Sequence, residues 1–238
     1  GVRFVGNGAT LRSAVTNGGN FIMFNGARDL TWDGIAIQGL SGSTGYDGSG
    51  LPNITGMNGL CFTSTTRDSE RISINNVLAT YQYTGIYVFG DGASSFKLRG
   101  MTITNFTHVS GLYGMAFHNN GDNVTIKSAR IYDTARGYFV FGIQNHDVQL
   151  HVLDGRTNFA AALIKSYDYN TSDIHLQIRA AKVTTSTKLG IESQHNVAAQ
   201  PTPGMVRNIS IDYDESGYAG GGGVFFAYYQ DASLQATA

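Results

Sequence analysis

The sequence predicts an all-β solenoid of about eight coils, and three features indicate this fold. Short apolar segments recur at intervals of 23 to 33 residues, a spacing typical of repeat architectures. The repeats consist of strands and turns, and the low content of Lys and Glu argues against a helical protein. The chain has 31 glycines but only 3 prolines, which suits tight corners that are formed many times, because glycine supplies the positive φ angles of sharp bends.

The clearest repeat runs from Gly114 to Ile131. An apolar segment follows Gly114, a polar turn covers 118–123, and the next segment alternates Val124 and Ile126. A propeller blade would need four antiparallel strands, whereas each unit has room for two or three strands and contains no hairpin signal. Each unit is therefore predicted to be one coil of a parallel β-helix. Equivalent units open at Gly59, Gly85, Gly137, Ala161, Gly190 and Gly223, with an earlier copy from Asn20.

Taken in chain order, the repeats predict one domain over residues 1–238. Residues 1–38 form the first coils, with Trp32 pointing inward beside Leu30. Residues 39–58 break the period with Gly, Ser and Pro, which predicts an inserted loop, and 195–204 predict a second one. Solenoids need capped ends, and neither end of this sequence shows a capping helix, so we expect a segment of a longer chain.

Strand alternation predicts which side chains leave the core. The first and third residues after each opening glycine point inward, and the second and fourth point outward. The outward set includes Tyr87, Phe89, Phe139 and Phe141, an aromatic patch that a monomer rarely leaves exposed. Two interpretations stay open: the rings stack on the sugars of a linear polysaccharide, or they contact another chain.

The same outward face carries candidate catalytic residues. Hydrolysis of a glycosidic bond requires two flanking carboxyl groups, and Glu192 and Asp168 lie on adjacent predicted coils. Elimination from a uronic acid instead requires a base and a cation, and Lys165 and His118 lie two coils apart, roughly 10 Å. Each of these residues also has an ordinary structural interpretation, as a turn residue or as a polar group on a solvated face.

Composition excludes several functions. The net charge of −1 with 14% charged residues offers no basic footprint for nucleic acid. No run of eighteen apolar residues predicts membrane insertion, and Cys61 alone forms no internal disulfide. No recognised metal or phosphate motif is present, so no cofactor is expected. Five Asn-x-Ser/Thr triplets are interpreted as turn residues, at Asn53, Asn105, Asn123, Asn170 and Asn208.

The openings GIYVF, GMAFH and GYFVF, paired with the strands VTIKSARI, SFKLRGMTI and RDLTWDGIAI, resemble the pectin-lyase-like superfamily of right-handed single-stranded parallel β-helices. The resemblance covers nearly the whole chain. Within that superfamily the chain looks most like the central domain of a bacteriophage tailspike. This resemblance implies a homotrimer that binds and cleaves bacterial surface polysaccharide, located outside the cell or on the virion. The alternatives are a secreted polysaccharide lyase or epimerase and a non-catalytic shaft. No catalytic motif of the superfamily matches, so no catalytic residue is transferred.

Overall fold

The protein consists of strands in every part that the structure describes. The structure is a computed structural model, and it describes residues 1–13, 19–40, 44–46, 52–54, 57–90, 96–154, 161–166, 169–180, 187–194, 204–214 and 223–229. Within these ranges there are sixteen strands and no helix. Fourteen of the strands join one sheet through parallel pairs, and the other two form a separate antiparallel pair. The all-β prediction is confirmed, and the parallel sheet is compatible with a parallel β-helix.

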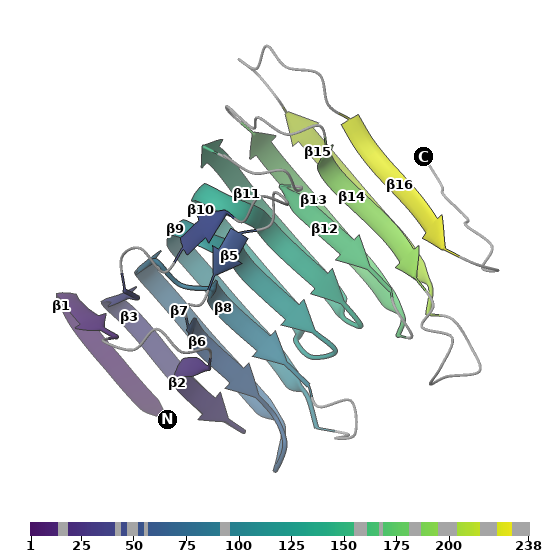
Figure 1. Ribbon diagram of the computed structural model, residues 1–238. Coiled ribbons are helices and arrows are strands. Elements are labelled where there is room, and N and C mark those ends of the chain that lie inside the picture. The colour runs from purple at the N-terminus through teal and green to yellow at the C-terminus, as the bar shows by residue number, and fades with distance from the viewer. Residues whose placement is uncertain are drawn as a thin grey trace.

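The parallel strands form two ladders, which share β9 and β10. The first ladder has the order β1 (Val2–Arg12), β3 (Arg28–Gln38), β7 (Ser69–Thr80), β9 (Leu98–His118), β10 (Asp122–Phe141), β11 (Gln144–Asp154), β13 (Thr171–Ala180) and β15 (Val206–Asp214). The second joins β2 (Asn20–Asn25), β6 (Asn58–Thr63), β8 (Thr84–Phe89), the C-terminal parts of β9 and β10, β12 (Ala162–Lys165), β14 (Thr187–Gln194) and β16 (Gly223–Tyr229). Figure 1 shows the strands side by side in chain order, with β1 at one end and β16 at the other.

The chain visits the two ladders alternately. A strand of the first ladder is followed by a strand of the second, and β9 and β10 bend from one ladder into the other without interruption. This alternation is compatible with the predicted repeat of two or three strands per unit. The predicted insertion at 39–58 contains the antiparallel pair β4 (Thr44–Tyr46) and β5 (Pro52–Ile54), whereas most of the predicted loop at 195–204 lies outside the described residues.

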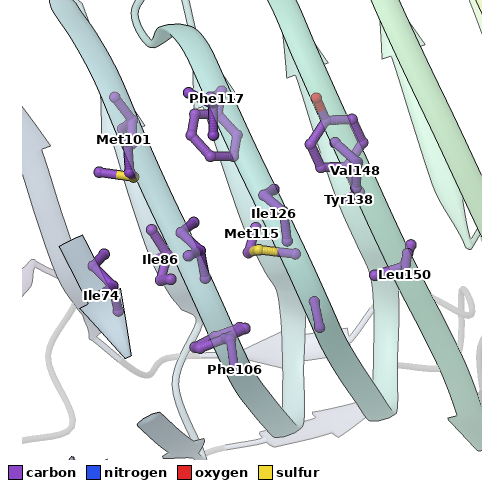
Figure 2. Packing of buried hydrophobic residues seen from close by; sticks show 14 of the residues in the cluster. Ile74, Ile86, Met101, Phe106, Met115, Phe117, Ile126, Tyr138, Val148 and Leu150 are labelled. Carbon is purple, nitrogen blue, oxygen red and sulfur yellow. The ribbon is translucent and has the colours of Figure 1, made fainter. Parts of the chain in front are cut away.

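The core consists of apolar rows that run across successive strands. One inward row of the first ladder contains, in register, Trp32, Ile74, Ile103, Ile126, Val148 and Leu176. The predicted inward positions of the second ladder are also buried, among them Ile86, Met115 and Tyr138. Figure 2 shows residues of both ladders within this core. Each inward side chain packs against the same position of the next repeat, so burial is continuous along the stack.

The opening glycines are required for a different reason from the one predicted. Gly59, Gly85, Gly114 and Gly137 have no positive φ angle. Instead, each approaches the backbone of the following repeat, and a Cβ atom at Gly114 would lie 2.6 Å from the carbonyl oxygen of Gly137. The expected glycines with positive φ occur at other positions, among them Gly26, Gly121 and Gly142. Close stacking of neighbouring repeats excludes a side chain at the opening glycines.

Left-handed backbone occurs instead at a row of mostly polar residues. The sheet register places in one line Asp29, Arg71, Gly100, Asn123, Asn145, Asp173 and Asn208, all with φ between 52° and 89°. Asn145 donates from Nδ2 to Asn123 Oδ1 (3.1 Å), and Asn208 donates to Asp173 Oδ1 (2.9 Å). Asn and Asp tolerate this conformation, and here their side chains bond across neighbouring strands. Asn123 and Asn208 lie within β10 and β15, near their first residues, rather than in turns.

Substitution of Asn145 tests this row. Asn145→Ala loses the hydrogen bond and places an ordinary side chain at φ 58°, whereas Asn145→Gly loses only the hydrogen bond. We expect the alanine variant to be less stable than the glycine variant by about 1 kcal/mol in urea unfolding. At Thr102, an exposed position within β9, the order should reverse, because glycine weakens a regular strand. If the alanine and glycine variants had the same order of stability at both positions, the role assigned to this row would be contradicted.

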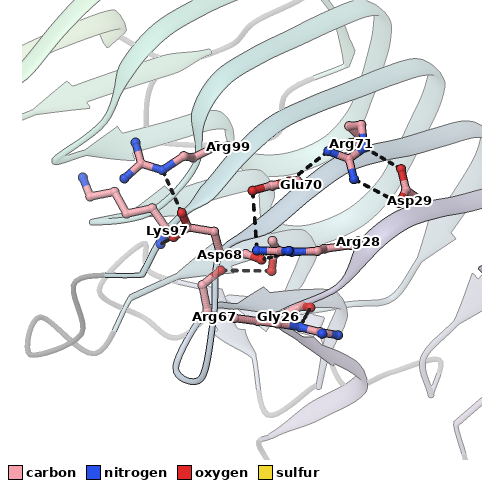
Figure 3. Close-up of polar contacts among 11 residues, drawn as sticks. Gly26, Arg28, Asp29, Arg67, Asp68, Glu70, Arg71, Lys97 and Arg99 are labelled. Atoms are coloured by element: carbon pink, nitrogen blue, oxygen red, sulfur yellow. Dashed lines mark hydrogen bonds and ion pairs between the residues drawn. The ribbon is translucent and has the colours of Figure 1, made fainter. Parts of the chain in front are cut away.

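Charged side chains link the first-ladder strands near their N-terminal ends (Figure 3). Arg71 donates to both carboxylate oxygens of Asp29 at 2.5 and 3.0 Å and also contacts Glu70 at 2.9 Å. The hydrogen bond from Arg71 holds the pKa of Asp29 below its ordinary value. Arg99 pairs with Asp68 on the neighbouring repeat (3.2 Å). Because these groups are exposed, their individual ion pairs contribute little to stability.

Candidate functional site: an aromatic face on the second ladder

The candidate site lies on the outward side of the second ladder, where register sets two parallel rows. One row contains Tyr87, Ala116, Phe139 and Leu163, from β8, β9, β10 and β12. The other contains Phe89, His118, Phe141, Lys165 and Glu192, from β8, β9, β10, β12 and β14. Because parallel neighbours lie ~4.8 Å apart, each row extends along the stack of strands. Sheet register therefore places seven of the eight predicted site residues in these two rows.

The rings of this aromatic face contact one another across three strands. Tyr87 stacks on Phe89 (centroids 4.9 Å apart), and His118 stacks on Phe141 (4.5 Å). The His118 ring is in T-shaped contact with the rings of Tyr87 (centroids 5.1 Å apart) and Phe139 (4.9 Å). Such offset and edge-to-face contacts are favourable beyond the area that they bury. The rings form a continuous surface from β8 to β10.

Tyr113 and Arg136 complete one side of this face, and the alternation of side chains did not predict them as members. Tyr113 stacks on Phe139 (5.1 Å), and the Arg136 guanidinium lies 5.4 Å and 5.7 Å from the centres of these two rings. Arg136 also donates to the Tyr113 hydroxyl (2.9 Å). Counting back from inward Met115 places Tyr113 inside, but the strand bends at this corner and alternation does not continue across the bend. The register of Tyr113 with Arg136, once known, identifies both residues.

The expectation of a fully exposed aromatic face is wrong in its middle. Phe139 and Leu163 are only 5% and 6% exposed, and Ala116 and Cys61 are completely buried. Phe139 is enclosed by Tyr113, Arg136, His118 and Phe141, so this ring serves as the base of the cluster. Tyr87, Phe89 and Phe141 are half-buried and retain surface for a ligand.

Burial changes the chemistry of His118 and Tyr87. The Tyr87 hydroxyl lies 3.2 Å from His118 Nδ1, and His118 Nε2 is buried without a hydrogen-bond partner. Desolvation lowers the pKa of His118 to about 3 and raises the pKa of Tyr87 to about 12. A general base for neutral pH needs a pKa nearer to 7. The shift therefore favours a neutral imidazole that positions Tyr87 and offers a hydrogen bond, rather than proton abstraction by His118.

The other candidate catalytic residues are less completely defined. Lys165 is half-buried and lies two register steps from His118, as predicted, and its strand partner is Glu192. The side chain of Glu192 and the whole of Asp168 lie outside the described residues. The backbone thus places a cation and a carboxylate one strand apart, ~4.8 Å.

Metal-ligand geometry and comparison with known proteins add no assignment for this face. In the described ranges, no three His, Cys, Asp or Glu side chains gather as metal ligands would. None of the described residues belongs to a helix with the length and apolarity needed to cross a membrane. Comparisons with protein-family models, curated proteins and solved structures give no match to this chain. The arguments about function therefore depend on the geometry of the chain itself.

Proposed function

We propose that the chain is a right-handed parallel β-helix that binds a linear polysaccharide along the outward side of its second ladder. The observation that supports this is the aromatic face of Tyr87, Phe89 and Phe141, which crosses consecutive repeats in the direction of the stack. Aromatic rings match the apolar faces of sugars, and a ligand with its own repeat can follow a surface that repeats. Between β8 and β12 the face extends over three strand spacings, roughly 15 Å.

Polar groups at the edge of the face would supply orientation. The Tyr87 hydroxyl and the unpartnered Nε2 of His118 offer hydrogen bonds beside the rings. Arg136 places positive charge next to Tyr113, and Lys165 places it next to Phe141 in register. Such a mixture of apolar rings with a few directed polar groups is typical of ligand sites. The two cations make an acidic bacterial surface polysaccharide the preferred substrate class.

The proposal includes depolymerase activity of the kind found in phage tailspikes, with a location outside the cell or on the virion. In a lyase reaction, Lys165 would neutralise the carboxylate of a uronic acid, and Glu192, its register partner, would take the proton beside that carboxylate. The glycosidic oxygen would leave with a proton from water as the double bond forms. In a hydrolase reaction, Glu192 would serve as one of the two carboxyl groups.

A second candidate function for the same face is contact between chains of a homotrimer. The exposed parts of Tyr87, Phe89 and Phe141 favour it, because aromatic residues are also enriched in interfaces. Solution mass separates the two functions. A monomer that binds polysaccharide would exclude the interface, and a trimer that loses its association on Phe89→Ala would support it.

The test of the proposed function is incubation of the protein with a panel of bacterial capsular and O-antigen polysaccharides. Product size and the ultraviolet absorbance of an unsaturated uronate are followed together. Shorter products with new absorbance would identify a lyase, and shorter products without it a hydrolase. Binding without cleavage would leave a receptor-binding protein. Absence of binding to every polysaccharide would overturn the proposal.

A further inference from the structure

A second candidate site lies at the C-terminal ends of the second-ladder strands, just beyond Phe89, His118 and Phe141, where the chain turns back to the first ladder. A pocket of ≈ 280 Å³ is lined there by residues from four successive turns. Gly90 follows β8, Asn119 follows β9, Gly142 follows β10, and Tyr169 precedes β13. The turns are held by backbone bonds from Gly90 N to His118 O (2.8 Å) and from Asn119 N to Phe141 O (2.9 Å). Stacked repeats thus form a pocket that no single turn could form.

The lining of this corner pocket includes an ion pair between a buried carboxylate and a partly exposed lysine. Asp122 is 2% exposed, and its Oδ2 lies 3.7 Å from Lys97 Nζ. Its Oδ1 accepts the backbone N–H of Gln144 at 3.2 Å. Burial of a carboxylate is costly unless it is paired and hydrogen-bonded, and here both conditions are met. Because the two charges balance, the pocket offers no net charge to an ion.

A residue of the pocket lining, Asn119, carries an unsatisfied acceptor. Its Oδ1 atom is buried without a hydrogen-bond partner. The backbone of Asn119 is left-handed (φ 53°). Its Oδ1 atom packs against Gly142, so closely that a Cβ atom added to Gly142 would lie 2.2 Å from it, and this packing fixes the side chain. An acceptor left unpaired in this way costs free energy, which a hydroxyl donor from a ligand would recover.

Tyr169 is the single aromatic residue among the described residues that line the pocket, and Asn170 and Ser172 add polar groups beside it. An aromatic ring with adjacent amide, hydroxyl and carboxylate groups suits a compact polyol that has apolar C–H faces. A phosphate or sulfate would meet the Asp122 carboxylate, and a metal cation would have to displace the Lys97 ammonium. The volume is close to the lower limit of ligand pockets, about 300 Å³, and fits one ring rather than a chain.

We infer that this corner pocket binds a single neutral sugar residue. Asn119 Oδ1 and the free lone pairs of Asp122 accept its hydroxyl protons, Lys97 donates to a ring or hydroxyl oxygen, and Tyr169 packs against its C–H groups. The pocket adjoins the aromatic face but is lined by other residues, and the inference does not depend on the function proposed for that face.

The test uses the full chain and the methyl glycosides of glucose, galactose, mannose and N-acetylglucosamine. Ligand-observed saturation-transfer NMR should detect at least one of them, with a Kd of about millimolar, as expected for a ligand of this size. Tyr169→Ala should weaken that binding roughly tenfold, and Tyr169→Phe should retain it because the ring remains. Lys127→Ala, exposed on the first ladder, serves as the control for unrelated surface changes.

Several outcomes would overturn the inference. The first is that no saturation transfer to any of the four glycosides is detected. The second is that saturation transfer is unchanged in Tyr169→Ala, and the third is that Tyr169→Ala and Lys127→Ala lose binding equally. Displacement of the sugar by inorganic sulfate would also overturn it, because it would show that the pocket selects anions. Thermal unfolding of each variant, compared with the parent protein, identifies loss of binding that is caused by loss of folding.

Discussion

Lowering the pH from 7 to 4.5 is expected to destabilise this protein strongly, because buried histidines resist protonation. His108 is completely buried with Nδ1 2.9 Å from Thr134 Oγ1. His146 is 2% exposed, lies 2.7 Å from the Tyr138 hydroxyl, and contacts the carbonyl oxygen of Gly121. Burial lowers the pKa of both residues to about 4.

The direction follows from proton linkage. Near pH 5 the unfolded chain protonates both imidazoles, whose ordinary pKa is ~6.5, while the folded protein leaves them neutral. The stabilising contribution is complete above pH 6.5 and is lost as the pH falls toward 4. Each histidine contributes up to ~3 kcal/mol over this range, a large part of the ~5–15 kcal/mol that stabilises a typical domain.

Urea unfolding followed by circular dichroism at pH 7.5, 6.5, 5.5 and 4.5 measures this effect. The midpoint should fall steeply below pH 6.5. Because burial also lowers the pKa of His118, three histidines contribute, and His146→Gln should reduce the slope by about a third. The pKa values of Asp29, Asp68 and Asp173 are lowered, so these carboxyl groups change the stability only at pH values below this range. They cannot account for a loss of stability between pH 6.5 and 4.5. A midpoint that stays constant from pH 6.5 to 4.5 would show that the buried histidines are not held neutral.

The second large effect is expected from Gly114→Ala. A Cβ atom there would lie 2.5 Å from Ile131 Cδ1 and 2.6 Å from the carbonyl oxygen of Gly137, so the neighbouring repeats must move apart. We expect a loss of about 3 kcal/mol or more in the free energy of unfolding. Thr102→Ala, at an exposed position of the same strand, should cost less than ~0.5 kcal/mol.

Calorimetric melting of both variants checks this prediction. If the Gly114→Ala variant melted at the same temperature as the parent protein, adjacent repeats would not be in contact at this glycine. The stacked arrangement of the second ladder would then need revision.

The sequence was sufficient to predict the repeat and its inward rows. Periodic apolar positions such as Ile86, Met115 and Tyr138 follow from strand alternation within one repeat, and stacking the repeats in register needs no further information. The reason for the opening glycines required the structure, because contact between Gly114 and Gly137 arises only when consecutive repeats are superposed.

The candidate site was predicted in part. Tyr87, Phe89, His118 and Phe141 were found because they share one outward parity within straight strands. Tyr113 and Arg136 were missed as members of the face because they precede the opening glycines, where the strands bend. The corner pocket was also missed, since Lys97, Asn119 and Tyr169 come from turns whose spacing in sequence varies between repeats.

The most direct test of the proposed polysaccharide site is the Kd of oligosaccharides of increasing length, cut from a polysaccharide that the protein binds. Because the aromatic face follows consecutive strands over roughly 15 Å, affinity should rise from the monosaccharide through several added sugars and then level off. Phe89→Ala combined with Phe141→Ala should remove this rise. Affinity that is independent of length, or a rise that persists in the double variant, would contradict binding along the second ladder.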